Sequence, residues 1–196
     1  MTKTYAKLNK GGAFQLMGRI PNISNPTEEQ RAAYAAANGY KELVETPAPG
    51  RYYEKTHVQD DAHVIEAWIP WDLDAAKRDA LDTVQAGRNS AMNNVVIPCD
   101  ALPNGILFNT EAMVYAIGLS ASPSLEGETW TDAADETHNL TADMLASIAV
   151  AMKAHIKSVQ DAARPVRDAI RAAKTVEEVE NALNHNDAVA EDMDAE

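Results

Sequence analysis

The sequence predicts an α+β protein: a small N-terminal antiparallel sheet with one helix, followed by a mainly helical unit with an inserted β-hairpin. Three observations predict this class. Short extended runs, broken by Pro, Gly and Asn, fill the first seventy residues. Helical spacing of apolar residues dominates the remainder. An Asn-Gly pair, which is a strong hairpin signal, interrupts that helical part at Asn104 and Gly105.

The first unit, residues 1–71, is predicted to contain five short strands and two hairpin turns. We expect the strands at residues 5–8, 13–17, 41–45, 52–58 and 63–69, with turns at 9–12 and 59–62. Seventy residues lie near the lower limit for a core that is stable alone. We therefore expect this unit to depend on contacts with something else.

One helix is predicted between these strands. Thr27, Glu28, Glu29 and Gln30 form a capping box, because the Thr hydroxyl can accept from the backbone N–H of Gln30 and the Gln side chain can reach back. The helix should end near Asn38, where Gly39 can supply a left-handed stop.

The second unit, residues 72–184, begins after Pro70 and Trp71 with a helix that Asp72 caps and that extends to about Asn94. An extended segment follows, and the Asn104–Gly105 pair is predicted to turn it back on itself. We expect Thr110 to cap a brief helix that stops at Gly118 or shortly after.

Residues 120–139 are polar and rich in turn-forming residues, so we expect a connector there. Thr141 is predicted to cap a long amphipathic helix that Pro165 kinks or breaks near Ala163. A second capping box at 175–178 opens a final helix through Leu183. Residues 185–196 are acidic and aperiodic and are predicted to be a disordered tail.

Charge and composition exclude several partners. The formal net charge of −13 argues against nucleic acid, because a binder must neutralise phosphates with clustered Lys and Arg. No apolar run approaches the roughly 18 residues of a membrane span, and no signal peptide is expected. The single cysteine, Cys99, excludes an internal disulfide framework and fits a reducing compartment.

Catalytic, cofactor-binding and metal-binding residues are not predicted, and we do not expect an enzyme. His57 and His63 flank Asp60 and Asp61 in one hairpin, but a zinc site needs three or four convergent ligands. We interpret them as surface residues. A small enzyme built around this hairpin remains the less favoured alternative. His138 is expected to cap a turn rather than to take part in catalysis.

Large aromatic side chains are the candidate interface residues. Two of the three tryptophans lie at the predicted junction between the units, where amphipathic rings can hold one body against another. The alternative is that they fill the junction itself. The candidate interface residues are Trp68, Trp71, Tyr52, Tyr53 and Trp130.

Several short motifs occur in a characteristic order and spacing between Lys77 and Leu183: Arg78, Leu81 and Arg88-Asn89; residues 104–110; Trp130-Thr131-Asp132; Leu140-Thr141; residues 153–155; and residues 170–178. In these motifs the stretch resembles DUF4376, a domain found in tail-associated proteins of tailed bacteriophages. The first seventy residues are also similar to small β-rich modules of phage tail proteins.

The resemblance implies a virion structural component of the tail (tail fibre, baseplate or tail tip) that acts through protein–protein contacts. Its partners would be other tail or fibre proteins, and it would form a homo-oligomer or part of a symmetric assembly. It would be located in the virion tail, and in the host cytoplasm during assembly. The alternative is a tail-fibre assembly chaperone that the mature virion does not retain. The family supplies no catalytic residues.

Overall fold

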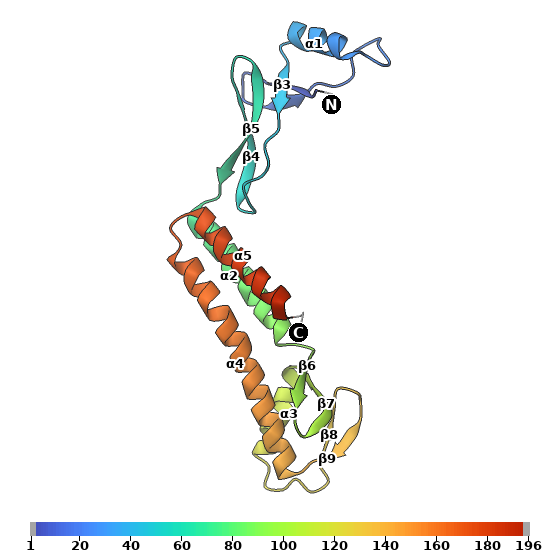
Figure 1. Ribbon diagram of the computed structural model, residues 1–196, viewed down its shortest axis with the longest axis vertical. Coiled ribbons are helices and arrows are strands. Elements are labelled where there is room, and N and C mark those ends of the chain that lie inside the picture. The colour runs from blue at the N-terminus through green and yellow to red at the C-terminus, as the bar shows by residue number, and fades with distance from the viewer. Residues whose placement is uncertain (1–2, 194–196) are drawn as a thin grey trace. The chain divides into compact units, whose positions relative to one another are not determined.

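The computed structural model describes residues 3–193, with side chains described as far as residue 184. The chain divides into two compact units, Met1–Leu73 and Asp74–Glu196 (Figure 1). The sequence predicted a boundary at residues 71 and 72, beside the Pro70-Trp71 pair. Both units mix helices and strands, and the α+β prediction is confirmed.

The N-terminal unit contains a five-stranded sheet with the strand order β2-β1-β3-β5-β4. Its strands are β1 (Tyr5–Leu8), β2 (Phe14–Leu16), β3 (Lys41–Val44), β4 (Tyr53–Gln59) and β5 (His63–Pro70). Three of the four strand pairs are antiparallel as predicted, but β3 and β5 run parallel. The sheet is therefore mixed, and β2 and β4 form its two edges.

Helix α1 (Glu28–Ala37) begins and ends where the sequence predicts. The Thr27 hydroxyl accepts from the Gln30 backbone, and the Gln30 side chain accepts from the Thr27 backbone, so the capping box is confirmed. Gly39 takes a φ of +71° just after the helix, which is the left-handed stop that glycine allows. Tyr5 on β1 donates its hydroxyl to Glu28, which ties the helix to the sheet.

One face of this sheet is buried and the other is open. Ala6, Val64 and Glu66 are buried on the first face. Val58 and Ile69 are exposed on the second face, where alternating residues of β4 and β5 point. A small unit buries a smaller fraction of its surface than a large domain does. The N-terminal unit thus leaves an apolar sheet face without cover from the described residues.

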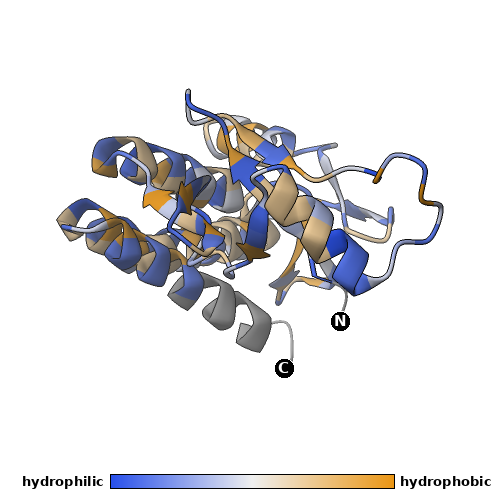
Figure 2. Ribbon diagram, turned by 90° about the horizontal axis from the view of Figure 1, so that it is seen from above, coloured by the Kyte–Doolittle hydropathy of each residue, from blue (hydrophilic) through white to orange (hydrophobic). Residues whose placement is uncertain are grey.

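The C-terminal unit is built around three helices, α2 (Leu73–Ala91), α4 (Ala142–Ala172) and α5 (Val176–Met193), which lie side by side (Figure 1). Hydrophilic and hydrophobic residues alternate along the helical ribbons (Figure 2), which is the pattern of helices with one buried side. Two hydrogen bonds join α2 to α4: Lys77 Nζ donates to the Arg171 carbonyl, and His155 Nε2 donates to the Ala91 carbonyl.

Helix α4 continues through Pro165 without a break, so of the two predicted outcomes near Ala163, a kink or a break, the break does not occur. A proline inside a helix removes one hydrogen bond, to the carbonyl four residues earlier. Here that residue is Asp161, which is exposed, so water can satisfy its carbonyl. Ala163 and Ile170 on either side of the proline are buried, and their packing holds the helix together.

Helix α5 extends beyond the predicted end at Leu183 and reaches Met193. Residues 176–183 place Val176, Val179 and Leu183 in the interior, as a helix with one apolar side must. The predicted acidic tail covers residues 185–196, whose side chains lie outside the described part of the chain. The prediction of disorder there stays untested.

The inserted hairpin is formed by β6 (Val95–Cys99) and β7 (Leu102–Phe108), but its turn is not where the sequence predicted. Cys99 pairs with Leu102, so the chain reverses at residues 100–101, and Asn104 and Gly105 lie inside β7. The register shifts between Ile97 and Cys99. The positive φ of Gly105, +74°, therefore serves an irregularity within the strand instead of a turn.

The next segment also differs from the prediction. Helix α3 (Thr110–Ser120) is capped by Asn109, whose side chain accepts from the Ala112 backbone, and not by Thr110. The connector contains a second small hairpin, β8 (Thr129–Thr131) and β9 (Thr137–Asn139), that the sequence analysis missed. Three-residue strands are too short to show an alternation that stands out from a polar loop.

The two hairpins, α3 and the first half of α4 enclose the largest apolar core of this unit. Its fully buried members include Leu102, Ile106, Phe108 and Ile148. No helix in the described part of the chain combines the length and the apolar composition that a bilayer crossing demands.

Candidate functional site

The predicted interface aromatics of the N-terminal unit differ in their exposure. Tyr52 is fully buried, at 0% exposure, while Trp71 is 36% exposed and packs edge-on against the Tyr52 ring at 5.5 Å between centroids. Tyr53 and Trp68 are half-buried. A side chain with no exposed surface cannot contact a partner. Tyr52 is therefore corrected to an interior residue that supports the exposed Trp71.

Trp68 is fixed by its neighbours on the buried sheet face. Its indole Nε1 donates to the Thr46 hydroxyl at 3.1 Å and lies 3.3 Å from the Thr46 carbonyl. Lys55, its partner on β4, places its ammonium 5.4 Å from the ring centroid. The same Lys55 pairs at 2.7 Å with the buried Glu66. Trp68 is thus a structural residue of the sheet with one half-exposed side.

Trp130, in the C-terminal unit, is buried at 4% exposure and is also corrected to an interior residue. It stands on β8 and stacks on Tyr115 of α3 with 5.6 Å between the ring centroids. The Tyr115 hydroxyl donates toward Glu128 and the Thr129 carbonyl, at 3.1 and 3.0 Å. Burial raises the pKa of Tyr115, and the bond to Glu128 adds to this effect. Trp130 therefore anchors the β8–β9 hairpin on α3.

The histidines of the β4–β5 hairpin do not converge on one point. His57 stacks on Phe14 of β2, with 3.7 Å between the ring centroids. His63 lies beside Asp60, whose carboxylate accepts from the backbone N–H groups of Ala62 and His63. These backbone hydrogen bonds hold the pKa of Asp60 below its usual range. The hairpin holds a turn-forming aspartate and two separated imidazoles.

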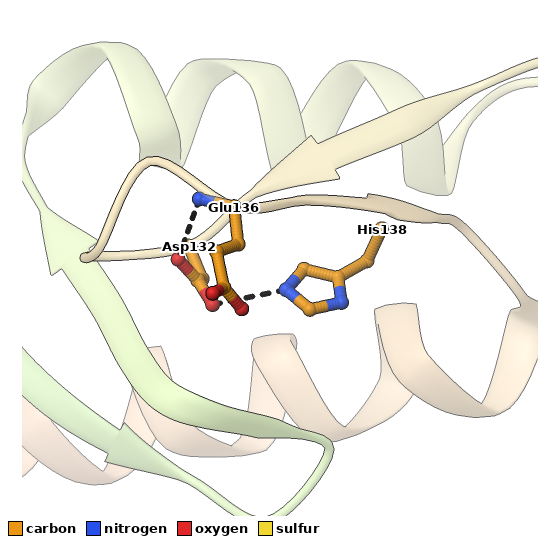
Figure 3. A group of neighbouring side chains, drawn as sticks. All are labelled: Asp132, Glu136 and His138. Carbon is orange, nitrogen blue, oxygen red and sulfur yellow. Dashed lines mark hydrogen bonds and ion pairs between the residues drawn. The ribbon is translucent and has the colours of Figure 1, made fainter.

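A different group of polar side chains converges in the C-terminal unit. Asp132, Glu136 and His138 each offer one ligand atom, and these atoms lie within 4.8 Å of one another. Figure 3 shows the three side chains gathered on one side of the turn between β8 and β9. Asp132 follows β8, Glu136 precedes β9, and His138 lies on β9 opposite Trp130. Among the residues whose side chains are described, no second group of this kind occurs.

Asp132 is the centre of this cluster, and it is almost fully buried, at 3% exposure. Its Oδ1 accepts from the backbone N–H groups of Ala134 and Glu136 at 2.9 and 3.0 Å. Its Oδ2 accepts from the Asn104 amide at 2.8 Å and from His138 Nε2 at 2.9 Å. A buried carboxylate is stable only when it is paired in this way.

These contacts decide the ionisation of Asp132. Burial raises the pKa of the Asp132 carboxyl, but the hydrogen bonds from His138, Asn104 and the two backbone amides together outweigh burial. The pKa therefore lies well below its usual range, and Asp132 is a carboxylate at neutral pH. A carboxylate only accepts hydrogen bonds, so His138 Nε2 carries the hydrogen between them.

The arrangement suits the binding of a cation. Two carboxylates and an imidazole are ligands for a divalent metal ion. Asn104, which also lies 3.3 Å from the Glu136 carboxylate, holds both acidic side chains in place. Asp132 and Glu136 were not singled out from the sequence. Their spacing carries a signal only once the short hairpin is known, because the turn brings residues 132, 136 and 138 to one side.

Helix α3 carries two strongly exposed apolar side chains three positions apart, which places them on the same side of the helix. Val114 and Ile117 are 61% and 63% exposed, while Ala116 and Leu119 on the other side are buried. Glu111 is the one charged residue of this helix. We call Val114 and Ile117, together with the half-exposed Tyr115, the α3 surface.

Comparison with known proteins found one relationship. Neither the comparison with curated proteins nor the comparison with solved structures found a match. A family model described as a domain of unknown function (DUF4376) matches residues 75–190, which is more than half of the chain and nearly all of the C-terminal unit. The chain therefore belongs to the DUF4376 family.

Proposed function

We propose that this protein is a structural component of a bacteriophage tail, in the tail fibre, the baseplate or the tail tip, and that it acts through contacts with other polypeptide chains. Support for the phage assignment comes from the DUF4376 family and from the resemblance of the first seventy residues to small tail modules. In this proposal the protein works in the virion tail, and it is found in the host cytoplasm while particles assemble.

The α3 surface is the observation that supports contact with other chains. A helix that is apolar on all sides is normally buried. Residues 112–119 of α3 are Ala, Met, Val, Tyr, Ala, Ile, Gly and Leu, and only one side of the helix faces the core. Val114 and Ile117 are left in water at more than 60% exposure. Removing them from water in an interface is worth about 1.5–3 kcal/mol per side chain.

A second copy of the same chain is the partner that fits this surface. The chain carries a net charge of −13, so two copies repel each other wherever their acidic surfaces meet. The α3 surface lowers this cost, since Glu111 is the single charge of the helix and Glu128, which Tyr115 contacts, is a further acid placed beside it. A two-fold contact would pair α3 with α3 and bury four large apolar side chains, two Val114 and two Ile117.

The N-terminal unit offers the contacts to other tail proteins. Strand β4 is an edge of the sheet, and alternate residues of this seven-residue strand direct their backbone N–H and C=O groups away from β5. Val58 and Ile69 are exposed beside this edge, and Trp71 follows at the end of β5. An added strand from a partner would satisfy the backbone and cover these side chains. The candidate interface of this unit is thus β4 with Trp71, Trp68 and Tyr53.

The composition of purified virions tests the assignment. We expect quantitative mass spectrometry to detect the protein in particles of the phage that encodes it, at a fixed ratio to the tail proteins. Abundance in infected cells together with absence from particles would instead support the assembly chaperone. Absence from both the particles and the tail-assembly intermediates would overturn the phage proposal. The small-enzyme alternative has less support, because His57 and His63 contact different partners.

A further inference from the structure

We propose that Asp132, Glu136 and His138 bind one divalent metal ion of the zinc class, which fastens the turn between β8 and β9. The proposal rests on these side chains alone and does not depend on the tail assignment. It concerns an ion with a structural role, because Asn104 of β7 holds Asp132 and the ion would therefore link the turn to the neighbouring hairpin.

The distances between the ligand atoms suit a single ion. Zinc binds imidazole nitrogen and carboxylate oxygen at about 2.0–2.2 Å, so two of its ligands lie roughly 3–4 Å apart. His138 Nε2 and Asp132 Oδ2 are 2.9 Å apart, close to this spacing. Glu136 completes a set whose members lie within 4.8 Å of one another. Its carboxylate lies 3.3 Å from the Asn104 amide, which also contacts Asp132.

Asp132 is held ready for the ion. Three donors other than His138 fix its carboxylate: the Asn104 amide and the backbone N–H groups of Ala134 and Glu136. Outer hydrogen bonds of this kind orient a metal ligand before the metal arrives. Asn104 comes from β7, so an ion bound here would join the β8–β9 turn to the neighbouring hairpin.

The ion would replace one hydrogen. In the described arrangement the hydrogen on His138 Nε2 bridges to Asp132 Oδ2. Metal binding needs the lone pair of that nitrogen, so the hydrogen must leave. In a neutral imidazole the proton is transferred to Nδ1, and in an imidazolium it is lost to solvent while Nδ1 keeps its own. The ion then takes the position between the imidazole and the two carboxylates, and water completes its coordination.

The ligand types decide which ion is bound. Calcium and magnesium prefer sites made of oxygen ligands only. An imidazole nitrogen with two carboxylate oxygens suits Zn²⁺, Co²⁺ or Mn²⁺, and among these three the affinity follows the order Mn²⁺, Co²⁺, Zn²⁺. We therefore expect saturable binding of Zn²⁺ and Co²⁺, and much weaker binding of Mg²⁺.

Titration calorimetry of the chelator-treated full-length protein with zinc chloride tests the proposal, with cobalt absorption as a second readout. We expect one ion per chain and a visible Co²⁺ spectrum. Glu136→Gln and His138→Gln should each weaken the binding at least about tenfold. Glu136 is exposed, so its variant will fold even if the His138 variant does not.

Asp135→Asn is the matched control, because Asp135 is an exposed carboxylate in the same turn and outside the ligand set. It should bind zinc as tightly as the unsubstituted protein. Equal weakening by Asp135→Asn and Glu136→Gln would show diffuse attraction to an acidic surface and would overturn the proposal. The absence of saturable binding would also overturn it, and the cluster would then be a network of hydrogen bonds that stabilises the turn.

Discussion

Gly105 is a residue whose environment leaves no room for a side chain. Its φ is +74°, and a Cβ atom built there would lie 2.5 Å from the backbone oxygen of Ile97 on the paired strand. Other amino acids tolerate neither the left-handed backbone nor this distance. The close approach explains why the Asn104–Gly105 pair occurs inside β7, where the register of the hairpin shifts.

We expect Gly105→Ala to lower the free energy of unfolding by about 3 kcal/mol or more, because backbone strain and a steric clash add together. Gly127→Ala is the control, since Gly127 has a φ of +80° but no atom within 4 Å of the added Cβ. That variant should lose only about 1–2 kcal/mol. Urea unfolding measures both losses, and equal losses would show that the clash with Ile97 is relieved without cost.

Asp132 makes the stability of the fold depend on pH. Its folded pKa lies below the unfolded value of about 3.9, so the ionised carboxylate stabilises the fold fully above that pH. This contribution is lost as the pH falls below about 4 towards the folded pKa. We expect Asp132→Asn to lower the Tm at pH 7 and to reduce the further fall in Tm between pH 5 and pH 2. Asp135→Asn should follow the unsubstituted protein, and parallel curves for all three would contradict this role of Asp132.

Residue-scale chemistry was predictable where partners are close in sequence. Thr27 and Thr141 cap their helices as predicted, because a cap needs only the next three residues. The pairing of Asp132 with Asn104 and His138 could not be predicted. Asn104 is 28 residues away from Asp132. His138 comes close to Asp132 only because β8 and β9 form a hairpin, which the sequence analysis did not predict.

At the scale of elements, α4 shows that apolar residues of one helix differ widely in burial. Ile148 is fully buried in the core between the hairpins, while Val150, two residues later on the same helix, is 68% exposed. The helical spacing of apolar residues predicted an amphipathic helix here, which must have one buried side. The three-residue strands β8 and β9 were missed because so short a run has no measurable period.

We expect Ile148→Ala to cost about 2–5 kcal/mol of unfolding free energy, because it leaves a cavity in a packed core. Val150→Ala on the same helix should change stability by no more than about 0.5 kcal/mol. Thermal unfolding followed by circular dichroism compares the two. Similar losses would mean that Val150 is buried in solution, most simply by a second chain.

The whole molecule consists of two units, and the spacing of apolar residues differs between their sequences. The fold class could be predicted, because alternation in the first seventy residues and helical spacing afterwards are long-range patterns. The parallel pairing of β3 with β5 could not, since register between distant strands depends on packing that no local pattern encodes. The exposed α3 surface could not be predicted from the sequence either, because a helix that is apolar on all sides is expected to be buried.

Sedimentation velocity over a range of protein concentrations tests whether this exposed helix joins one chain to another. We expect the unsubstituted protein to associate as its concentration rises, and Val114→Ser/Ile117→Ser to remain monomeric with an unchanged circular dichroism spectrum. Val150→Ser, which changes an exposed apolar residue of α4, is the control and should associate normally. A monomer at every concentration, or association that the double substitution leaves intact, would contradict the account.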